Sequence, residues 1–286
     1  MKNIIHAMMK TLRTATPIYL AVLVVCGMLA NAGINLPEPM KWAYTPVEKT
    51  TMYAMSFVED IEAAKTPPLA EVPESMTVAA GVFENVHVTS KEQVVPYVIR
   101  IPEGIVPKMP LVVYLHDEGV TSIPELAGQG VVQAAEMYDI NTCIIIQPLL
   151  DDAWTTLEKE AIVRDMTQSI VSKFYCDETR VILTGFGAGA KDVWTYATMA
   201  PDYWQNISPI SAAAPADITS LYGNNVSCYL VCGEYDVYAI KGAMKQAGTT
   251  LTENGASVVQ VVVEEADHDA VRNAAYDNDW FAWACQ

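Results

Sequence analysis

Zinc-binding patterns are missing from this 286-residue sequence, which contains only four histidines. The six cysteines form no C-x-x-C pair and have no zinc-type spacing; they stand at positions 26, 143, 176, 228, 232 and 285. The spacing also assigns no disulfide pair. We therefore expect neither a metal site nor a cofactor.

Basic residues are scarce, since 17 lysines and arginines stand against 34 acidic residues, for a net charge of −17. Such a chain repels phosphate backbones and anionic lipid surfaces. The charge excludes nucleic acid as a favoured partner and is typical of a protein that stays dissolved outside the cell.

No apolar run reaches the roughly 20 residues that a transmembrane helix needs. Residues 1–32 instead resemble a secretory signal peptide, with a basic start, an apolar run from Pro17 to Leu29 and a small-residue cleavage site at Ala30-Asn31-Ala32. We predict cleavage after Ala32 and a secreted or cell-surface protein. The alternative is an uncleaved anchor, the one route by which this sequence predicts membrane contact.

Beyond the leader, residues 33–75 are rich in proline and are interpreted as a linker, and residues 76–286 as one domain. Short apolar runs such as Leu111 to Leu115 alternate with segments of helical spacing such as Thr155 to Tyr175, and we expect a further helix from Pro124 to Met137. This alternation predicts a mainly parallel central sheet with helices on both faces. Two early strands, Val82 to Val88 and Val95 to Ile101, predict an antiparallel N-terminal edge.

Polar motifs follow four of the predicted strands, where open α/β sheets collect their functional groups. They are His116-Asp117-Glu118-Gly119, Thr184-Gly185-Phe186-Gly187-Ala188-Gly189, Gly233-Glu234-Tyr235-Asp236 and Ala266-Asp267-His268-Asp269. The set resembles the α/β-hydrolase superfamily, and more narrowly the secreted esterases grouped with polyhydroxybutyrate depolymerases and feruloyl or acetyl-xylan esterases. That resemblance covers about residues 80–286 and implies an α/β-hydrolase fold, with Asp236 as the acid and His268 as the base of a triad.

Two departures from the family pattern argue against ordinary esterase chemistry. Gly187 stands where the family has its serine nucleophile, and it has no oxygen to attack a carbonyl. Asp117 stands where the family has glycine, close to the oxyanion site that Ala188 N–H helps to form. A carboxylate ~4 Å from an oxyanion costs about 4 kcal/mol at an effective dielectric of 20. Losing an oxyanion donor costs a comparable amount, about 2.7–4 kcal/mol.

These residues predict a pseudoesterase that binds a small molecule, a carbohydrate, a polyester fragment or a protein partner at the former active site, with Trp154 as a candidate pocket residue. The alternative is an active carboxylic-ester hydrolase in which His268 activates water directly. A third interpretation is a purely structural surface domain. The prediction of lost acyl transfer fails if the fold brings another Ser, Thr or Cys within bonding reach of His268.

Overall fold

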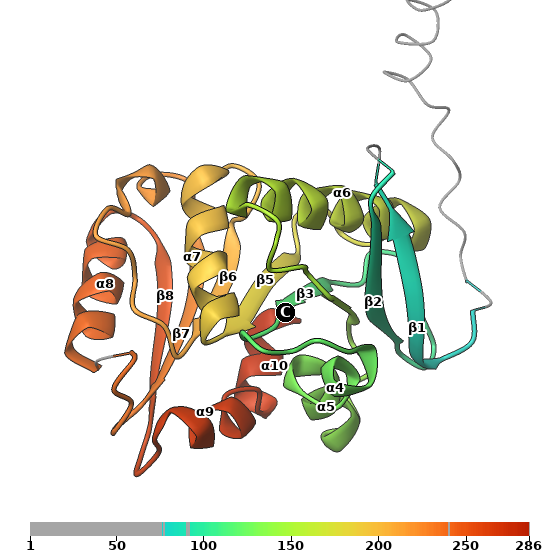
Figure 1. The fold of residues 1–286 in the computed structure, drawn as a ribbon. Helices are drawn as coiled ribbons and strands as arrows, with labels where there is room; N and C mark the ends of the chain where they lie inside the picture. Colours follow the sequence, from blue (N-terminus) through green and yellow to red (C-terminus); the bar gives the residue numbers. More distant parts are fainter. Residues whose placement is uncertain (1–75, 77, 90–91, 240, 286) are drawn as a thin grey trace, which may run out of the picture. The chain divides into compact units, whose positions relative to one another are not determined.

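The computed structural model describes residues 76–285 apart from 77, 90, 91 and 240 (Figure 1). The predicted signal peptide and linker, residues 1–32 and 33–75, lie outside the described residues. Within the described part of the chain, no helix is both long and apolar enough to cross a membrane.

Eight strands form one sheet in the order β1-β2-β4-β3-β5-β6-β7-β8. They are β1 (Gly81–Val88), β2 (Val94–Ile101), β3 (Leu111–Leu115), β4 (Ile144–Pro148), β5 (Val181–Phe186), β6 (Asn206–Ile210), β7 (Ser227–Gly233) and β8 (Ser257–Val263). The β1–β2 and β2–β4 pairs are antiparallel, and the other five pairs are parallel. The predicted parallel sheet with an antiparallel N-terminal edge is therefore confirmed.

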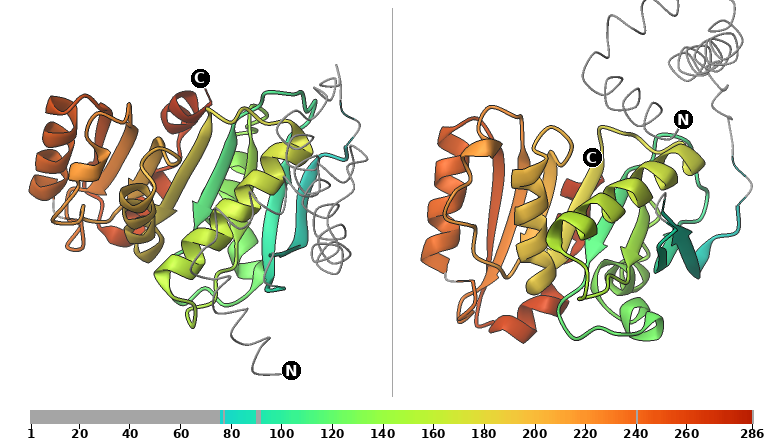
Figure 2. Two further views of the ribbon diagram at one scale, coloured as in Figure 1. Left: turned by 90° about the horizontal axis from the view of Figure 1, so that it is seen from above. Right: turned by 45° about the horizontal axis from the view of Figure 1, so that its top comes forward.

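Helices cover both faces of this sheet (Figures 1 and 2). On one face lie α6 (Thr156–Phe174), α7 (Ala188–Met199) and α8 (Lys241–Glu253). On the other lie α4 (Ile123–Ala127), α5 (Gly130–Met137), α9 (His268–Ala274) and α10 (Asn278–Ala284). Because β3 and β4 are buried on both sides, their sequences LVVYL and IIIQP are almost continuously apolar.

Helix α6 begins where the sequence predicted. Thr155 Oγ1 accepts a hydrogen bond from Glu158 N–H at 3.3 Å, and a Glu158 carboxylate oxygen accepts one from Thr155 N–H at 2.8 Å. This reciprocal capping box satisfies two backbone donors that the first helical turn leaves without partners.

Two helices differ from the sequence prediction. The single helix expected from Pro124 to Met137 is two helices, because the helical backbone is interrupted between Ala127 and Gly130. Gly130 has φ +65°, and the Tyr114 ring lies 2.5 Å from where a Cβ would be, so a side chain at this position would be strained and would clash. The seven-residue helix α9 was not predicted.

The parallel strands β3, β5, β6, β7 and β8 all point the same way, so their carboxyl ends meet at one edge of the sheet. The segments that follow these five strands form the candidate site.

Candidate functional site

Four of the residues that the sequence singled out, Asp117, Gly187, Ala188 and His268, line one small cavity of about 210 Å³. It is lined by Asp117, Glu118, Gly187, Ala188, Lys191, Ser211, Tyr238 and His268. The fold thus unites the segments after β3, β5 and β8, as predicted. It also adds Lys191, Ser211 and Tyr238, which the sequence motifs did not include.

Gly187 forms the sharp turn between β5 and α7. Its φ and ψ are 56° and −113°, a backbone conformation in which most residues are strained. Its N–H donates to Ile210 O at 3.2 Å, and its carbonyl accepts from Lys191 N–H as α7 begins. The backbone of an elbow is therefore present, without a side chain at its tip.

The Asp117 carboxylate fills the space above Gly187. A Cβ built on Gly187 would lie 2.7 Å from Asp117 Cγ and closer still to one of its oxygens. Asp117 Oδ1 accepts a hydrogen bond from Ala188 N–H at 2.8 Å. The carboxylate therefore accepts the hydrogen bond of the Ala188 N–H, the donor that the sequence assigned to an oxyanion.

Arg272 holds this carboxylate in place, a contact that no sequence motif predicted. Its Nη2 donates to Asp117 Oδ2 at 3.2 Å and lies 3.6 Å from Asp269 Oδ1. The guanidinium carbon lies 4.7 Å from the centre of the Phe186 ring. Asp117 is thus not the unpaired repulsive charge that we predicted, because an arginine on α9 neutralises it.

Asp236 and His268 do lie together, and a third residue links them. His268 Nδ1 lies 3.3 Å from both carboxylate oxygens of Asp236 and 2.9 Å from Ser211 Oγ. The Ser211 hydroxyl donates to Asp236 Oδ2. Asp236 Oδ1 also accepts from the N–H groups of Tyr238 and Ala239, at 2.9 and 3.1 Å. This network fixes the imidazole with its Nδ1 side toward the acid.

Ser211 follows β6 directly and was missed because its sequence context, Pro209-Ile210-Ser211, is typical of the end of a strand. Its φ of 61° is unusual for a residue other than glycine, and it turns the hydroxyl toward β7. The one sequence signal for the contact of Ser211 with His268 is a hydroxyl-bearing residue at the end of a predicted parallel strand. A serine therefore does lie within hydrogen-bonding reach of His268, which is the condition under which the prediction of lost acyl transfer would fail. Whether Ser211 can act as a nucleophile depends on which ring nitrogen it faces and where its proton points.

No protein-family model matches this chain, and no curated protein matches its sequence. Solved structures match its shape. A thermostable esterase superposes with a TM-score of 0.59 at 18% identity, over 71% of this chain and 62% of that one. The feruloyl esterase module from Clostridium thermocellum gives 0.54 at 13%, over 72% and 87%. Brefeldin A esterase gives 0.54 at 12%, over 78% and 80%.

The fold is the α/β-hydrolase fold. The chain spans 62% of the length of the thermostable esterase. These neighbours are esterases, and at 12–18% identity the likeness shows a shared fold, the fold that the sequence resemblance implied.

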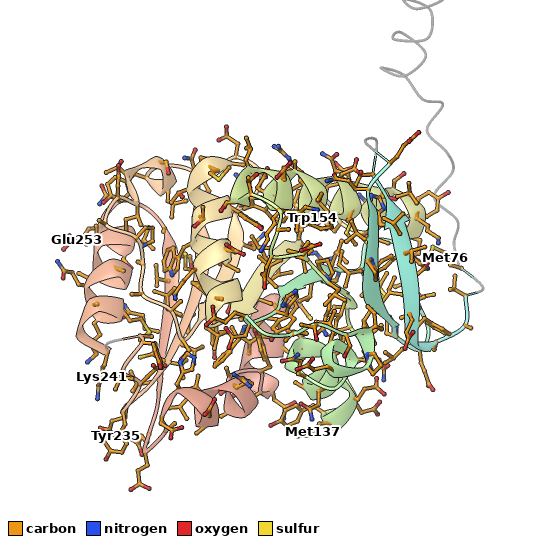
Figure 3. The ribbon with its side chains drawn as sticks, in the orientation of Figure 1. Met76, Met137, Trp154, Tyr235, Lys241 and Glu253 are labelled. Carbon is orange, nitrogen blue, oxygen red and sulfur yellow. The ribbon has the colours of Figure 1, made fainter. Side chains whose placement is uncertain are left out.

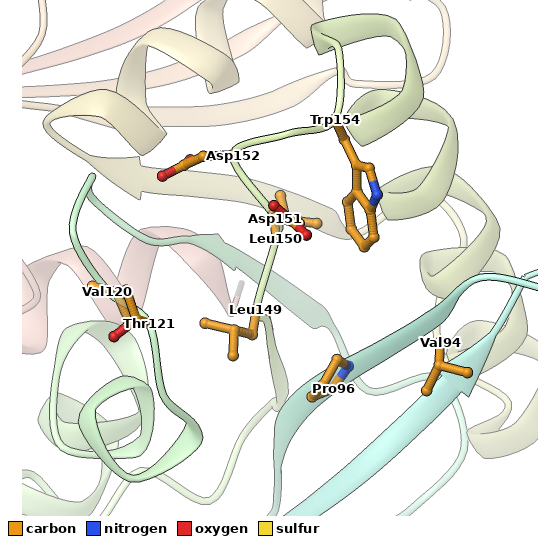
Figure 4. Close-up of a pocket in the computed structure, with 9 residues that line it drawn as sticks. All are labelled: Val94, Pro96, Val120, Thr121, Leu149, Leu150, Asp151, Asp152 and Trp154. Atoms are coloured by element: carbon orange, nitrogen blue, oxygen red, sulfur yellow. The ribbon is translucent and has the colours of Figure 1, made fainter.

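Two other predicted residues lie outside the Gly187 cavity of this α/β-hydrolase domain. His116 uses both ring nitrogens locally: Nδ1–H donates to Asp117 O at 2.8 Å, and Nε2 accepts from Leu150 N–H at 3.1 Å. These partners require the neutral ring. Trp154 lines a separate cavity of about 330 Å³ beside the start of α6 (Figures 3 and 4). Among the described residues, no three His, Cys, Asp or Glu side chains are grouped to hold a metal ion.

The Asp236 network makes a prediction about acid stability. Burial alone would raise the pKa of Asp236, but hydrogen bonds from Ser211, Tyr238, Ala239 and His268 outweigh it and lower the pKa below its usual value. A depressed folded-state pKa stabilises the fold above the unfolded pKa of about 3.9, and this stabilisation is lost as pH falls through the folded value.

Asp236→Asn is therefore expected to lower the free energy of unfolding by about 1–3 kcal/mol at pH 7. The difference from the unmodified protein should shrink below about pH 4, as Asp236 itself becomes protonated. Urea unfolding at pH 7, 5 and 3 measures both effects, with Asp202→Asn, an exposed acid, as the matched control. A deficit that stays constant down to pH 3 would contradict the assignment.

Proposed function

We propose that this domain is a pseudoesterase, an esterase-like fold that binds a ligand at its carboxyl edge and does not form an acyl-enzyme. One observation supports this above the others: the Asp117 carboxylate lies where a nucleophile's side chain would be and accepts the Ala188 N–H. An ester carbonyl would have to displace an ion-paired carboxylate to reach that donor.

Ser211 does not replace the missing nucleophile in this arrangement. An activated serine gives its proton to the base from the side opposite the acid. Ser211 instead lies on the Nδ1 side with Asp236 and directs its own proton to that carboxylate. Although Ser211 lines the cavity, it is only 1% exposed, which disfavours attack of its Oγ on an ester carbonyl. Its role is to position His268.

The alternative function is direct hydrolysis, in which His268 takes a proton from water. The observation in its favour is that Asp236 and Ser211 occupy Nδ1, and His268 lines the cavity beside Gly187. This mechanism still lacks an oxyanion donor while Asp117 holds Ala188 N–H, and losing such a donor costs about 2.7–4 kcal/mol of transition-state stabilisation.

The ligand of a pseudoesterase of this kind would be a small molecule. A carbohydrate or polyester fragment follows from the family resemblance, and one of the structural neighbours is a feruloyl esterase module complexed with sinapinate. We further propose that the protein works outside the cell, because the first 32 residues have the pattern of a signal peptide.

p-Nitrophenyl acetate tests this function directly. We expect no burst of p-nitrophenol and no labelling by a fluorophosphonate probe, because neither residue 187 nor Ser211 can form an acyl-enzyme. The slow background rate should be equal for the unmodified protein and His268→Ala. A rate that falls on His268→Ala would establish the direct-hydrolysis alternative, and a probe adduct on Ser211 would identify a displaced nucleophile.

A further inference from the structure

A second cavity at the carboxyl edge, the Trp154 pocket, has a volume of about 330 Å³, against about 210 Å³ for the Gly187 cavity. It is lined by Val94, Pro96, Val120, Thr121, Leu149, Leu150, Asp151, Asp152 and Trp154. The two cavities share no lining residue. Its volume is at the lower end of the range for ligand pockets and holds one small organic molecule.

The walls of the Trp154 pocket combine aliphatic and aromatic side chains with the polar side chains of Thr121, Asp151 and Asp152. Figure 4 shows the Trp154 indole on one side of the pocket, just before the start of α6. Pro96 and Val94 of β2 lie on the opposite side, and Leu149 lies between. Within the described residues, the indole N–H of Trp154 has no hydrogen-bond partner. An aromatic face with aliphatic walls favours a ligand with an apolar body.

The carboxylates beside these walls have fewer positively charged partners than negative charges. Asp151 Oδ1 accepts from Ala153 N–H at 2.8 Å, but its second oxygen has no partner in the described part of the chain. Asp152 pairs with Lys159 at 3.3 Å. Asp192 lies near the same lysine, and burial, reinforced by the charge of Asp152, raises its pKa despite that lysine. Lys159 therefore faces two carboxylates, those of Asp152 and Asp192.

We propose that the Trp154 pocket binds a small organic monocation, such as an alkylammonium or quaternary ammonium compound, with its charge between Asp151 and the face of Trp154. A cation over an indole face is attracted by the negative face of the ring, in addition to hydrophobic contact. The unpaired carboxylate adds attraction that a neutral sugar or polyester fragment would not use and an anion would oppose. The net charge of −17 also favours cations over anions as ligands of this protein.

This inference rests on the ligand-binding part of the proposed function and not on the loss of acyl transfer. The two therefore fail separately: the p-nitrophenyl acetate assay concerns residue 187 and His268, and a ligand titration concerns Trp154 and Asp151.

The test is a titration of ¹⁵N-labelled full-length protein with choline, followed at the indole N–H signal that Trp154→Phe identifies. The comparison ligand is 3,3-dimethylbutan-1-ol, the neutral isostere of choline. We expect a saturable shift with choline and at least tenfold weaker binding of the alcohol. Asp151→Asn, which keeps shape and removes charge, should weaken choline binding at least fivefold. Asp202→Asn, at the opposite edge of the sheet, should leave it unchanged.

Several outcomes would overturn the proposal. Equal binding of choline and the alcohol would show a merely apolar pocket. Saturation by methyl β-glucoside in place of choline would show a carbohydrate site. An unchanged affinity in Asp151→Asn, or no response of the Trp154 signal to choline, would remove the assigned charge recognition. Thermal unfolding of each variant confirms that a lost response reflects the pocket and not the fold.

Discussion

Gly187→Ser alone is expected to yield no acyl-enzyme and a less stable domain. The new Cβ would lie 2.7 Å from Asp117 Cγ, so the carboxylate would have to leave both Ala188 N–H and Arg272. A residue with a side chain at φ 56° and ψ −113° adds strain of about 1–3 kcal/mol. The loss of charge-assisted hydrogen bonds costs about 1.5–3 kcal/mol more.

Gly187→Ser combined with Asp117→Gly is expected to recover fluorophosphonate labelling and a burst with p-nitrophenyl acetate. The second change removes the obstructing carboxylate and frees Ala188 N–H, while His268 still lines the cavity. Recovery of one oxyanion donor corresponds to roughly 10²–10³ in rate over the single variant. Intact-mass measurement of the labelled protein gives the extent of reaction and, after digestion, the residue modified.

Two further variants test whether the charge or the volume of the side chain at position 117 prevents labelling, and whether His268 is required. Gly187→Ser with Asp117→Asn keeps the side chain that fills the space, so it should remain unlabelled. Adding His268→Ala to the serine–glycine pair should abolish labelling. If Gly187→Ser alone reacts as fast as the double variant, Asp117 is no obstacle. If the double variant folds and stays inert, the elbow does not present residue 187 to His268.

Gly189→Ala is expected to destabilise the domain strongly, because α7 passes very close to β3 at this glycine. A Cβ at this position would lie 2.6 Å from His116 O and nearer still to Leu115 O. Both are backbone atoms of β3 and the segment after it, so α7 would have to move away from the strand. Overpacking of a well-packed site costs about 1–3 kcal/mol, and displacement of a helix costs at least the upper end of that range.

Gly242→Ala is the matched control, since nothing lies within 4 Å of a Cβ at that position in α8. It should leave stability unchanged or raise it by up to about 1 kcal/mol through helix propensity. Urea unfolding midpoints of the two variants provide the measurement. Equal midpoints for the two alanine variants would show that α7 and β3 do not approach as closely as the structure indicates.

The positions of the strands followed from the sequence because each one carries its own signal. Leu111 to Leu115 is apolar without interruption since β3 is covered on both sides, and Thr155 with Glu158 marks the start of α6 through local hydrogen bonds. The break before Gly130 could not be predicted in this way. It depends on the Tyr114 ring, which lies 16 positions earlier in the chain.

The sequence by itself determined that residue 187 has no nucleophile and that Asp117, Asp236 and His268 stand at strand ends, since these facts are residue identities and spacings. Only the tertiary structure decided what those residues do to one another. The place of Asp117 in the oxyanion site, its pairing with Arg272 and the link of Ser211 to His268 join residues 57 to 155 positions apart. Contacts across such separations arise from strand order and helix packing, which no local pattern of residues encodes.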